Sequence, residues 1–288
     1  MTKDNFVALA NVGGALFEQR RLDEAMDFYQ RSYGINPRYA EAANSIGAVL
    51  AAQGSEEAVE WFRKALEVDP NHADALFNLG NAMAKQKRLP EAIEYFQACL
   101  KSKPENYEAR NNLANAWFQL GRLDDAIAQY RLALNYEPSA PLIRKNLGEM
   151  LAAKGRLDEA VIQYQQALRY TNDAAIHYSL GLTLAVQRKW DQAIGEYRAT
   201  LKLAPTNAEA QYNLGYALRL KAQFNEATVH LREALHLRPE FPLAHYNLAC
   251  VLAEQGATEE AKSELRQAIQ QKPDYDEARD MLAKLGVR

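Results

Sequence analysis

Asparagine recurs along the chain at a spacing of about 34 residues or a multiple of it, and its side chain suits the binding of peptide backbone. A carboxamide offers both N–H donors and an acceptor oxygen, so a row of them can bond to an extended backbone of any sequence. Each hydrogen bond contributes only about 0.5–1.5 kcal/mol net, so several must act together. The residues concerned are Asn11, Asn78, Asn112, Asn146, Asn213 and Asn247, with Asn81 and Asn115 one turn further on.

A second set combines aromatic rings with one arginine in the C-terminal third of the chain. Tyr178, Tyr212 and Tyr246 stand directly before the recurring Asn or Ser, and Tyr216 and Arg219 follow on the same predicted helix face. Exposed tyrosine and arginine among aliphatic residues are typical of the few residues that dominate a protein–protein contact. We therefore predict that this set anchors a partner while the asparagines bond to its backbone.

Both sets also have a purely structural interpretation. Asparagine at this position can bond one helix to the next, and a tyrosine just before it can pack between neighbouring helices. Ligand contact and helix–helix bonding are both open roles for the asparagines at this point. Tyr216 and Arg219 stand outside the positions that the structural role explains, which favours binding for the C-terminal set.

Residues for catalysis or metal binding do not gather anywhere in the sequence. Cys99 falls at a position of small packed residues, and the five histidines lack metal-ligand spacing. We therefore expect no enzymatic activity and no cofactor. Cys99 and Cys250 stand too far apart in a repeat array to form a disulfide, which favours a reducing compartment and a cytoplasmic location.

The spacing of these residues reflects a period of 34 residues along the whole chain. Each unit has a small residue in its first helix, an alanine twelve residues later (eleven in one shortened unit), and a third small residue seven beyond that. Small side chains let helices approach closely, so the three positions predict helix crossings. The first of them, called the glycine position below, is Gly13, Gly47, Gly80, Ala114, Gly148, Gly181, Gly215 and Ala249.

Prolines mark the joints between the predicted helices. Seven of the ten close a unit, and Pro90, Pro141 and Pro242 fall in the first turn of a predicted helix, where the missing N–H costs nothing. Every chain breaker thus stands at a joint. The sequence predicts sixteen helices in pairs, a closing helix and no strand.

These recurring residues resemble the tetratricopeptide repeat family over nearly the whole chain. Asn-Leu-Gly in the first helix, Glu-Ala before the second, Ala-Leu seven residues on and the closing Pro carry the resemblance. It implies an all-α fold, a right-handed superhelical solenoid of antiparallel helix pairs with a concave groove. One domain would span 1–288, with repeats 6–39, 40–72, 73–106, 107–140, 141–173, 174–207, 208–241 and 242–275 and a capping helix 276–288.

The resemblance also implies a function in protein binding. In this family the first helix of each repeat lines the groove, so the asparagine, tyrosine and arginine positions would face a partner there. Family members that grip the acidic C-terminus of chaperones use lysines and an arginine at positions where only Lys145 matches here, so that activity is not expected. We expect a non-enzymatic scaffold that binds a peptide or segment of a partner protein.

Two other functions fit the same pattern. The asparagine series resembles the ladder in the repeat region of O-linked N-acetylglucosamine transferases, so the chain could be the substrate-presenting part of a larger enzyme such as a protein O-glycosyltransferase. Alternatively, the N-terminal end, which lacks a cap, could pack on another copy in a self-assembling array. The polar cap at 276–288 favours the scaffold over the larger enzyme.

Composition excludes further classes of protein. A net charge of −3, from 34 Lys+Arg against 37 Asp+Glu, gives no electrostatic footprint for nucleic acid. A hydrophobic fraction of 48% excludes a disordered chain. Since no apolar run approaches the ~18 residues of a membrane span, we expect no membrane insertion.

Overall fold

The computed structural model describes residues 5–286, which are helical apart from short turns and contain no strand. These residues form two compact units that divide between Pro138 and Ser139. The first unit contains α1 (Phe6–Glu18), α2 (Leu22–Ile35), α3 (Ala40–Ala52), α4 (Ala58–Val68), α5 (Ala73–Lys85), α6 (Leu89–Ser102), α7 (Tyr107–Gln119) and α8 (Leu123–Tyr136). The second contains α9 (Pro141–Ala153), α10 (Leu157–Ala167), α11 (Ala174–Val186), α12 (Trp190–Leu203), α13 (Ala208–Leu220), α14 (Phe224–Leu237), α15 (Pro242–Glu254), α16 (Thr258–Gln271) and α17 (Asp276–Gly286).

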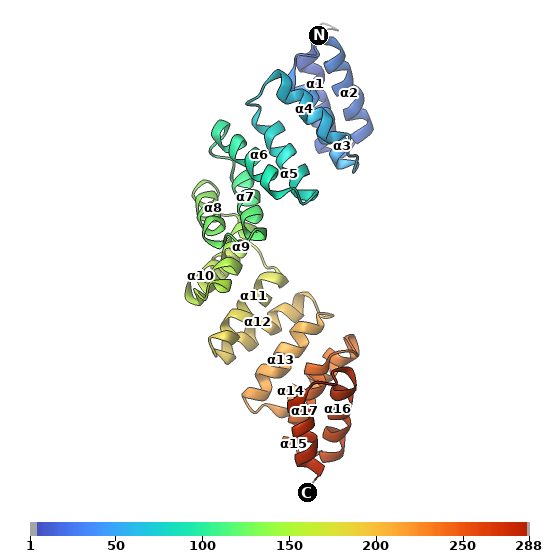
Figure 1. The fold of residues 1–288 in the computed structure, drawn as a ribbon, viewed down its shortest axis with the longest axis vertical. Helices are drawn as coiled ribbons and strands as arrows, with labels where there is room; N and C mark the ends of the chain where they lie inside the picture. Colours follow the sequence, from blue (N-terminus) through green and yellow to red (C-terminus); the bar gives the residue numbers. More distant parts are fainter. Residues whose placement is uncertain (1–4, 287–288) are drawn as a thin grey trace. The chain divides into compact units, whose positions relative to one another are not determined.

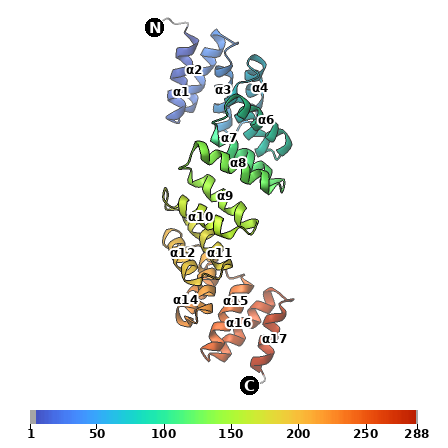
Figure 2. The ribbon, with the colours of Figure 1, turned by 90° about the vertical axis from the view of Figure 1, so that its left-hand side faces the viewer.

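Within each unit the helices form consecutive pairs, one pair for each repeat. Each odd-numbered helix packs against the even-numbered helix that follows it and against the one that precedes it, and α17 packs on α16 (Figures 1 and 2). The predicted all-α solenoid of helix pairs is therefore confirmed in each unit. That all eight repeats form one domain stays a prediction.

The glycine position explains how closely the two helices of a repeat cross. A Cβ added at Gly80 would lie 2.6 Å from Cε1 of Phe96, and one at Gly181 would lie 2.7 Å from Cε1 of Tyr197. Both rings come from the second helix of the same repeat and are at most 1% exposed. The ring thus occupies the space that a side chain on the first helix would need.

The other two small positions are buried, as predicted. At the alanine position, seven of the eight residues have no exposed surface and Ala58 is 3% exposed. The third position tolerates more chemical variety, because Cys99 and the hydroxyl-bearing Ser32 and Thr200 are also fully buried there. The Thr200 hydroxyl donates to the Glu196 carbonyl at 2.9 Å, so its burial leaves no donor unsatisfied.

The turn between the two helices of a repeat places one residue at positive φ, seven after the glycine position. Glycine fills that place in four repeats, whereas Arg20, Lys87, Arg188 and Ala222 adopt φ values of 62, 61, 58 and 55° in the others. The residue after the turn then bonds back to the helix, as Gln223 N does to Leu218 O at 2.9 Å. The shared closing bond holds non-glycine residues in a conformation that costs them about 1–2 kcal/mol.

A pair of glycines in one repeat tests the crossing. Gly181→Ala should destabilise the protein by about 1–3 kcal/mol, because its methyl group would overlap the Tyr197 ring. Gly195→Ala on α12 is the matched control, because Gly195 is exposed and nothing lies within 4 Å of a Cβ added there. Alanine is more favourable than glycine inside a helix by about 0.5–1 kcal/mol, so this variant should not be destabilised. Urea unfolding measures both changes. Equal effects from the two substitutions would contradict this account of the glycine position.

Candidate functional site

The predicted binding residues stand on one face of the first helices, which we call the ladder face. It comprises the residues three and two before the glycine position and those one, four and five after it. In residues 139–286, Asn213 Nδ2 donates to the Tyr178 hydroxyl at 3.0 Å, and Asn247 Nδ2 donates to the Tyr212 hydroxyl at 3.2 Å. The same bond recurs one repeat later, so α11, α13 and α15 share a fixed alignment.

In residues 5–138 the asparagines bond to one another across neighbouring first helices. Asn78 Nδ2 donates to Asn44 Oδ1 at 3.0 Å, and Asn112 Nδ2 donates to Asn81 Oδ1 at 2.7 Å. Asn112 also accepts from Asn111 Nδ2 at 3.0 Å. Helix–helix bonding, one of the two roles left open by the sequence, is therefore present in both units.

Asn78 and Asn81, which are neighbours on one face of α5, each keep one polar atom free of any protein bond. Asn78 donates a hydrogen bond through Nδ2, and its Oδ1 has no partner among the described residues. Asn81 accepts a hydrogen bond through Oδ1, and its Nδ2 has no partner among them. Both side chains are only partly buried. One turn of α5 therefore presents a free acceptor and a free donor.

The other predicted asparagines also have partners within the protein. The Tyr130 hydroxyl donates to Asn115 Oδ1. Asn146 on α9 also has an interaction partner. Asn247 is 4% exposed and donates both to Tyr212 and to the Leu243 carbonyl, at 2.8 Å, while its own Oδ1 is buried without a partner. Of these three side chains, Asn247 offers the least surface to a ligand.

Three of the predicted tyrosines pack against a second aromatic ring of their own repeat. The Tyr212 ring lies 4.7 Å from that of Phe241, and the Tyr246 ring lies 5.1 Å from that of Tyr275. The third, Tyr178, lies 6.2 Å from the ring of Tyr197. Burial raises the pKa of Tyr212 to about 12. The structural interpretation offered for this tyrosine position agrees with these contacts.

Tyr216 and Arg219 differ from those three. The Tyr216 ring stacks on Tyr212 with 6.3 Å between centroids and meets the edge of Trp190 at 6.1 Å. The Arg219 guanidinium carbon lies 5.3 Å from the centre of the Tyr216 ring. Both side chains are half-buried on the ladder face. They form a partly open aromatic and cationic cluster on α13.

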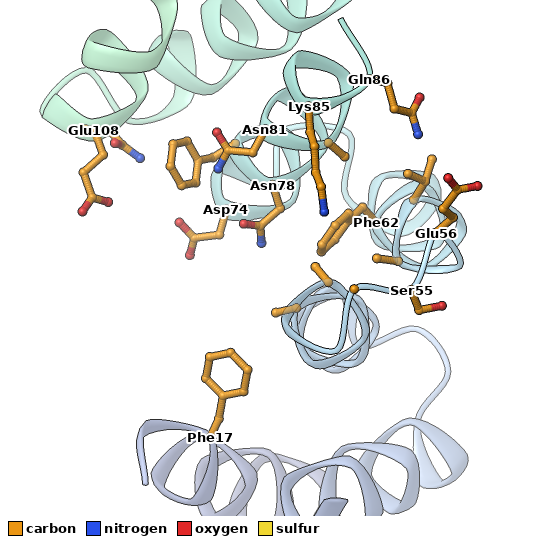
Figure 3. A pocket seen from close by; sticks show the side chains of 18 of the residues that line it. Phe17, Ser55, Glu56, Phe62, Asp74, Asn78, Asn81, Lys85, Gln86 and Glu108 are labelled. Carbon is orange, nitrogen blue, oxygen red and sulfur yellow. The ribbon is translucent and has the colours of Figure 1, made fainter. Parts of the chain in front are cut away.

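A hollow of about 1080 Å³ opens on the ladder face of residues 5–138. Its apolar wall includes Phe17 of α1 and Phe77 of α5, both partly buried, and the small side chains Ala48 and Ala51 of α3 leave the space between them. Figure 3 shows Phe17 facing the side chains of α5 across this space. Small residues on α3 are therefore the local cause of the hollow.

One stripe of α5 contributes four polar side chains to the lining of the hollow, which also includes Glu56, Glu105 and Glu108 from elsewhere. Asp74, Asn78, Asn81 and Lys85 all line it and follow helical spacing along that helix (Figure 3). Asp74 is in the first turn and Lys85 in the last, so the two ends of the stripe carry opposite charges. Lys103 Nζ lies 3.9 Å from Asp74 Oδ1, whereas Lys85 has no hydrogen bond or ion pair with a described residue.

The sequence pattern points to Asn78 and Asn81 but does not predict the hollow beside them. Large side chains are the usual sign of a binding anchor, which favours the tyrosines of the C-terminal repeats instead. The available signal was the small size of the residues one and four after Gly47, namely Ala48 and Ala51. The corresponding residues after Gly215 are Tyr216 and Arg219, whose side chains are much larger.

The described residues offer no arrangement for metal chemistry. Within 5–286, no three or more His, Cys, Asp or Glu side chains are placed to hold a metal ion. Burial raises the pKa of the Cys99 thiol to about 11, which keeps it protonated and unreactive near neutral pH. No helix in this range is long and apolar enough to cross a membrane.

The tyrosine–asparagine bond can be tested by removing one hydroxyl. Tyr212→Phe should lower the free energy of unfolding by about 0.5–1.5 kcal/mol, because Asn247 loses an acceptor in a buried setting. Tyr216→Phe is the matched control, since its hydroxyl bonds to no described residue, and should change stability by less than about 0.5 kcal/mol. Chemical denaturation compares the two variants. A larger loss in Tyr216→Phe would contradict the assignment of the bond.

Solved structures with the same fold are found at low sequence identity. YrrB, a TPR protein with an unusual peptide-binding site, is 24% identical with a TM-score of 0.61, over 66% of this chain and 98% of its own. PilF of Pseudomonas aeruginosa is 20% identical with a TM-score of 0.66, over 72% of this chain and 95% of its own. The Cut9–Hcn1 structure is 20% identical with a TM-score of 0.58, over 96% of this chain and 55% of that one. At these identities the likeness is one of fold.

Family models give the assignment. A comparison with curated proteins found no match. Models of the tetratricopeptide repeat match residues 48–106 and 178–227, 83–142 and 218–285, and 7–39, and a TPR repeat model matches 148–187. Together these ranges cover most of the chain and agree with the helix pairs of both units. The chain therefore belongs to the tetratricopeptide repeat family, whose fold serves protein–protein interaction.

Proposed function

We propose that the chain is a non-enzymatic interaction protein that binds an extended segment of a partner protein in the hollow of residues 5–138. The observation that carries this proposal is the pairing of a free acceptor, Asn78 Oδ1, with a free donor, Asn81 Nδ2, beside an apolar wall. An extended peptide presents N–H and C=O groups in alternation, so the two carboxamides can bond to its backbone without reading its sequence.

The volume and lining of the hollow support a peptide ligand. At about 1080 Å³ it is at the upper end of the range for ligand pockets, which fits several side chains of an extended segment. An apolar or aromatic side chain of the partner would pack between Phe17 and Phe77, supplying affinity that two amide bonds alone lack. Lys85, which has no partner of its own, would favour an acidic residue at that end.

Asn112, another predicted site residue, has a supporting role in this proposal. Asn112 fixes the orientation of Asn81 through the 2.7 Å bond between them, so it positions the residue that meets the peptide.

The peptide-binding site of YrrB adds support from a protein of the same fold. Both cysteines are free thiols, which supports a reducing, cytoplasmic location.

Filling the hollow tests the proposal. Peptides selected from a random phage-displayed library on the purified chain should lose at least about tenfold in affinity for Ala51→Trp, because the indole would occupy the space between Phe17 and Phe77. Isothermal titration calorimetry measures the change.

Ala128→Trp is the matched control, because it adds the same side chain at an exposed alanine of α8, off the ladder face and outside the lining of the hollow. It should bind the selected peptides as the unsubstituted chain does. Selected peptides that bind Ala51→Trp at full affinity would place the site elsewhere and contradict the proposal.

A further inference from the structure

Arg219 is a half-buried arginine without a protein partner. Its Nε is buried and bonds to nothing among the described residues. The two terminal nitrogens also form no hydrogen bond or ion pair there, yet they are not buried, so solvent reaches them. Packing against the Tyr216 ring, rather than hydrogen bonding, holds the guanidinium in place.

This state is unusual for an arginine in this chain. Elsewhere in the C-terminal unit, arginines reach carboxylates of a neighbouring repeat, as Arg198 does with Glu226 at 2.7 Å and Arg232 with Glu260 at 2.8 Å. Arg266, which also forms no hydrogen bond or ion pair with a described residue, is exposed and remains hydrated. Arg219 is both partly desolvated and unpaired, so the N–H groups of its charged guanidinium lack an acceptor in the protein.

The surroundings of Arg219 carry little opposite charge. Burial raises the pKa values of Cys250 and Tyr246 on α15, and the positive charge of Arg219 opposes both rises, which places the guanidinium near these two groups. Glu254, at the end of α15, also acts on Cys250 but forms no ion pair with Arg219. The polar end of Arg219 therefore lies among a phenol, a thiol and solvent.

Apolar surface flanks Arg219 on both sides. On α11, Leu182 is 37% exposed and Val186 is 68% exposed, and both belong to the ladder face, one and five residues after Gly181. On α15, Cys250 is half-buried and its Sγ lies 3.7 Å from Met281 Sδ. A ligand that covers this cluster must therefore continue past the guanidinium in both directions.

We propose that Arg219 is a specificity-determining residue that receives an Asp or Glu side chain from within a partner segment, with apolar residues on both sides of that acid. The guanidinium fork would donate to the carboxylate in bidentate geometry. Tyr216 would form the floor beneath the ion pair, and the apolar flanks would pack on Leu182 and Val186. This site is in residues 139–286 and is independent of the hollow proposed above.

The test uses the Arg219 side chain as its own reporter. A buried Nε–H exchanges slowly with water, so its ¹H–¹⁵N resonance can be followed in the full chain and is assigned by its loss in Arg219→Gln. The probes are Ac-Ala-Leu-Glu-Leu-Ala-NH₂, its Gln analogue, and Ac-Ala-Leu-Leu-Ala-OH, whose only carboxylate is at the C-terminus. We expect the Glu peptide to shift this resonance to saturation and to bind at least about tenfold more tightly than the other two.

Variants separate recognition by Arg219 from general attraction. Arg219→Gln should lose the roughly tenfold preference for Glu over Gln, whereas the matched control Arg266→Gln, at an exposed arginine of the same unit, should keep it. Ala51→Trp should keep it as well, so failure of the hollow proposal would not affect this result. If Arg219→Gln does not fold, the comparison of the three peptides on the unsubstituted chain decides.

Three results would overturn the proposal. They are equal binding of the Glu and Gln peptides, full preference retained in folded Arg219→Gln, and preference for the peptide with the C-terminal carboxylate. The last result would show that the guanidinium takes the end of a chain and that the apolar flanks do not define the ligand. The absence of any saturable shift with the Glu peptide would equally overturn it.

Discussion

The contact on which the rest of the structure depends is a large side chain of the second helix resting on the small residue of the first, which is a ring over glycine in five repeats and Leu231 over Gly215 in a sixth. At Gly80 and Gly181 a single added carbon would fall 2.6 and 2.7 Å from that ring. This contact fixes the distance and rotation of the two helices in a repeat. The residue two before the glycine is about 200° away around the helix, so the same contact turns the asparagine position outward onto the ladder face.

Once first helices are aligned, bonds between their ladder faces become possible at every repeat. The two tyrosine–asparagine bonds of the C-terminal unit are 3.0 and 3.2 Å long and join residues 35 apart. The asparagine–asparagine bonds of the N-terminal unit also join neighbouring first helices, but with shorter side chains. A shorter side chain at the tyrosine position also leaves more open space, so the choice of bonding residue affects what surface remains for a ligand.

The sequence predicts the helices well because their signals are local. Small residues at crossings and prolines at joints act within one repeat, and the observed helices follow them. The turns show where local signals end. Arg188 and Ala222 adopt the positive φ that glycine adopts in four other repeats, because the closing hydrogen bond of the turn outweighs their preference. No single residue type marks those turns.

The candidate site is harder to predict from the sequence, because it depends on which polar atoms have no hydrogen-bond partner once the repeats have packed. Asn78 and Asn112 occupy the same repeat position, yet Asn78 keeps a free oxygen while both polar atoms of Asn112 are engaged, a difference set by Asn44, Asn81 and Asn111. Likewise, Glu226 of the next repeat reaches Arg198, whereas no carboxylate of the next repeat forms an ion pair with Arg219.

An unsatisfied polar group costs free energy in the isolated protein, and a ligand that satisfies it recovers that cost upon binding. Because each polar group that the helices leave unpaired favours a particular ligand group, binding preference in these repeats follows from what helix packing leaves unsatisfied. The partly used carboxamides favour peptide backbone, and the unpaired guanidinium favours a carboxylate.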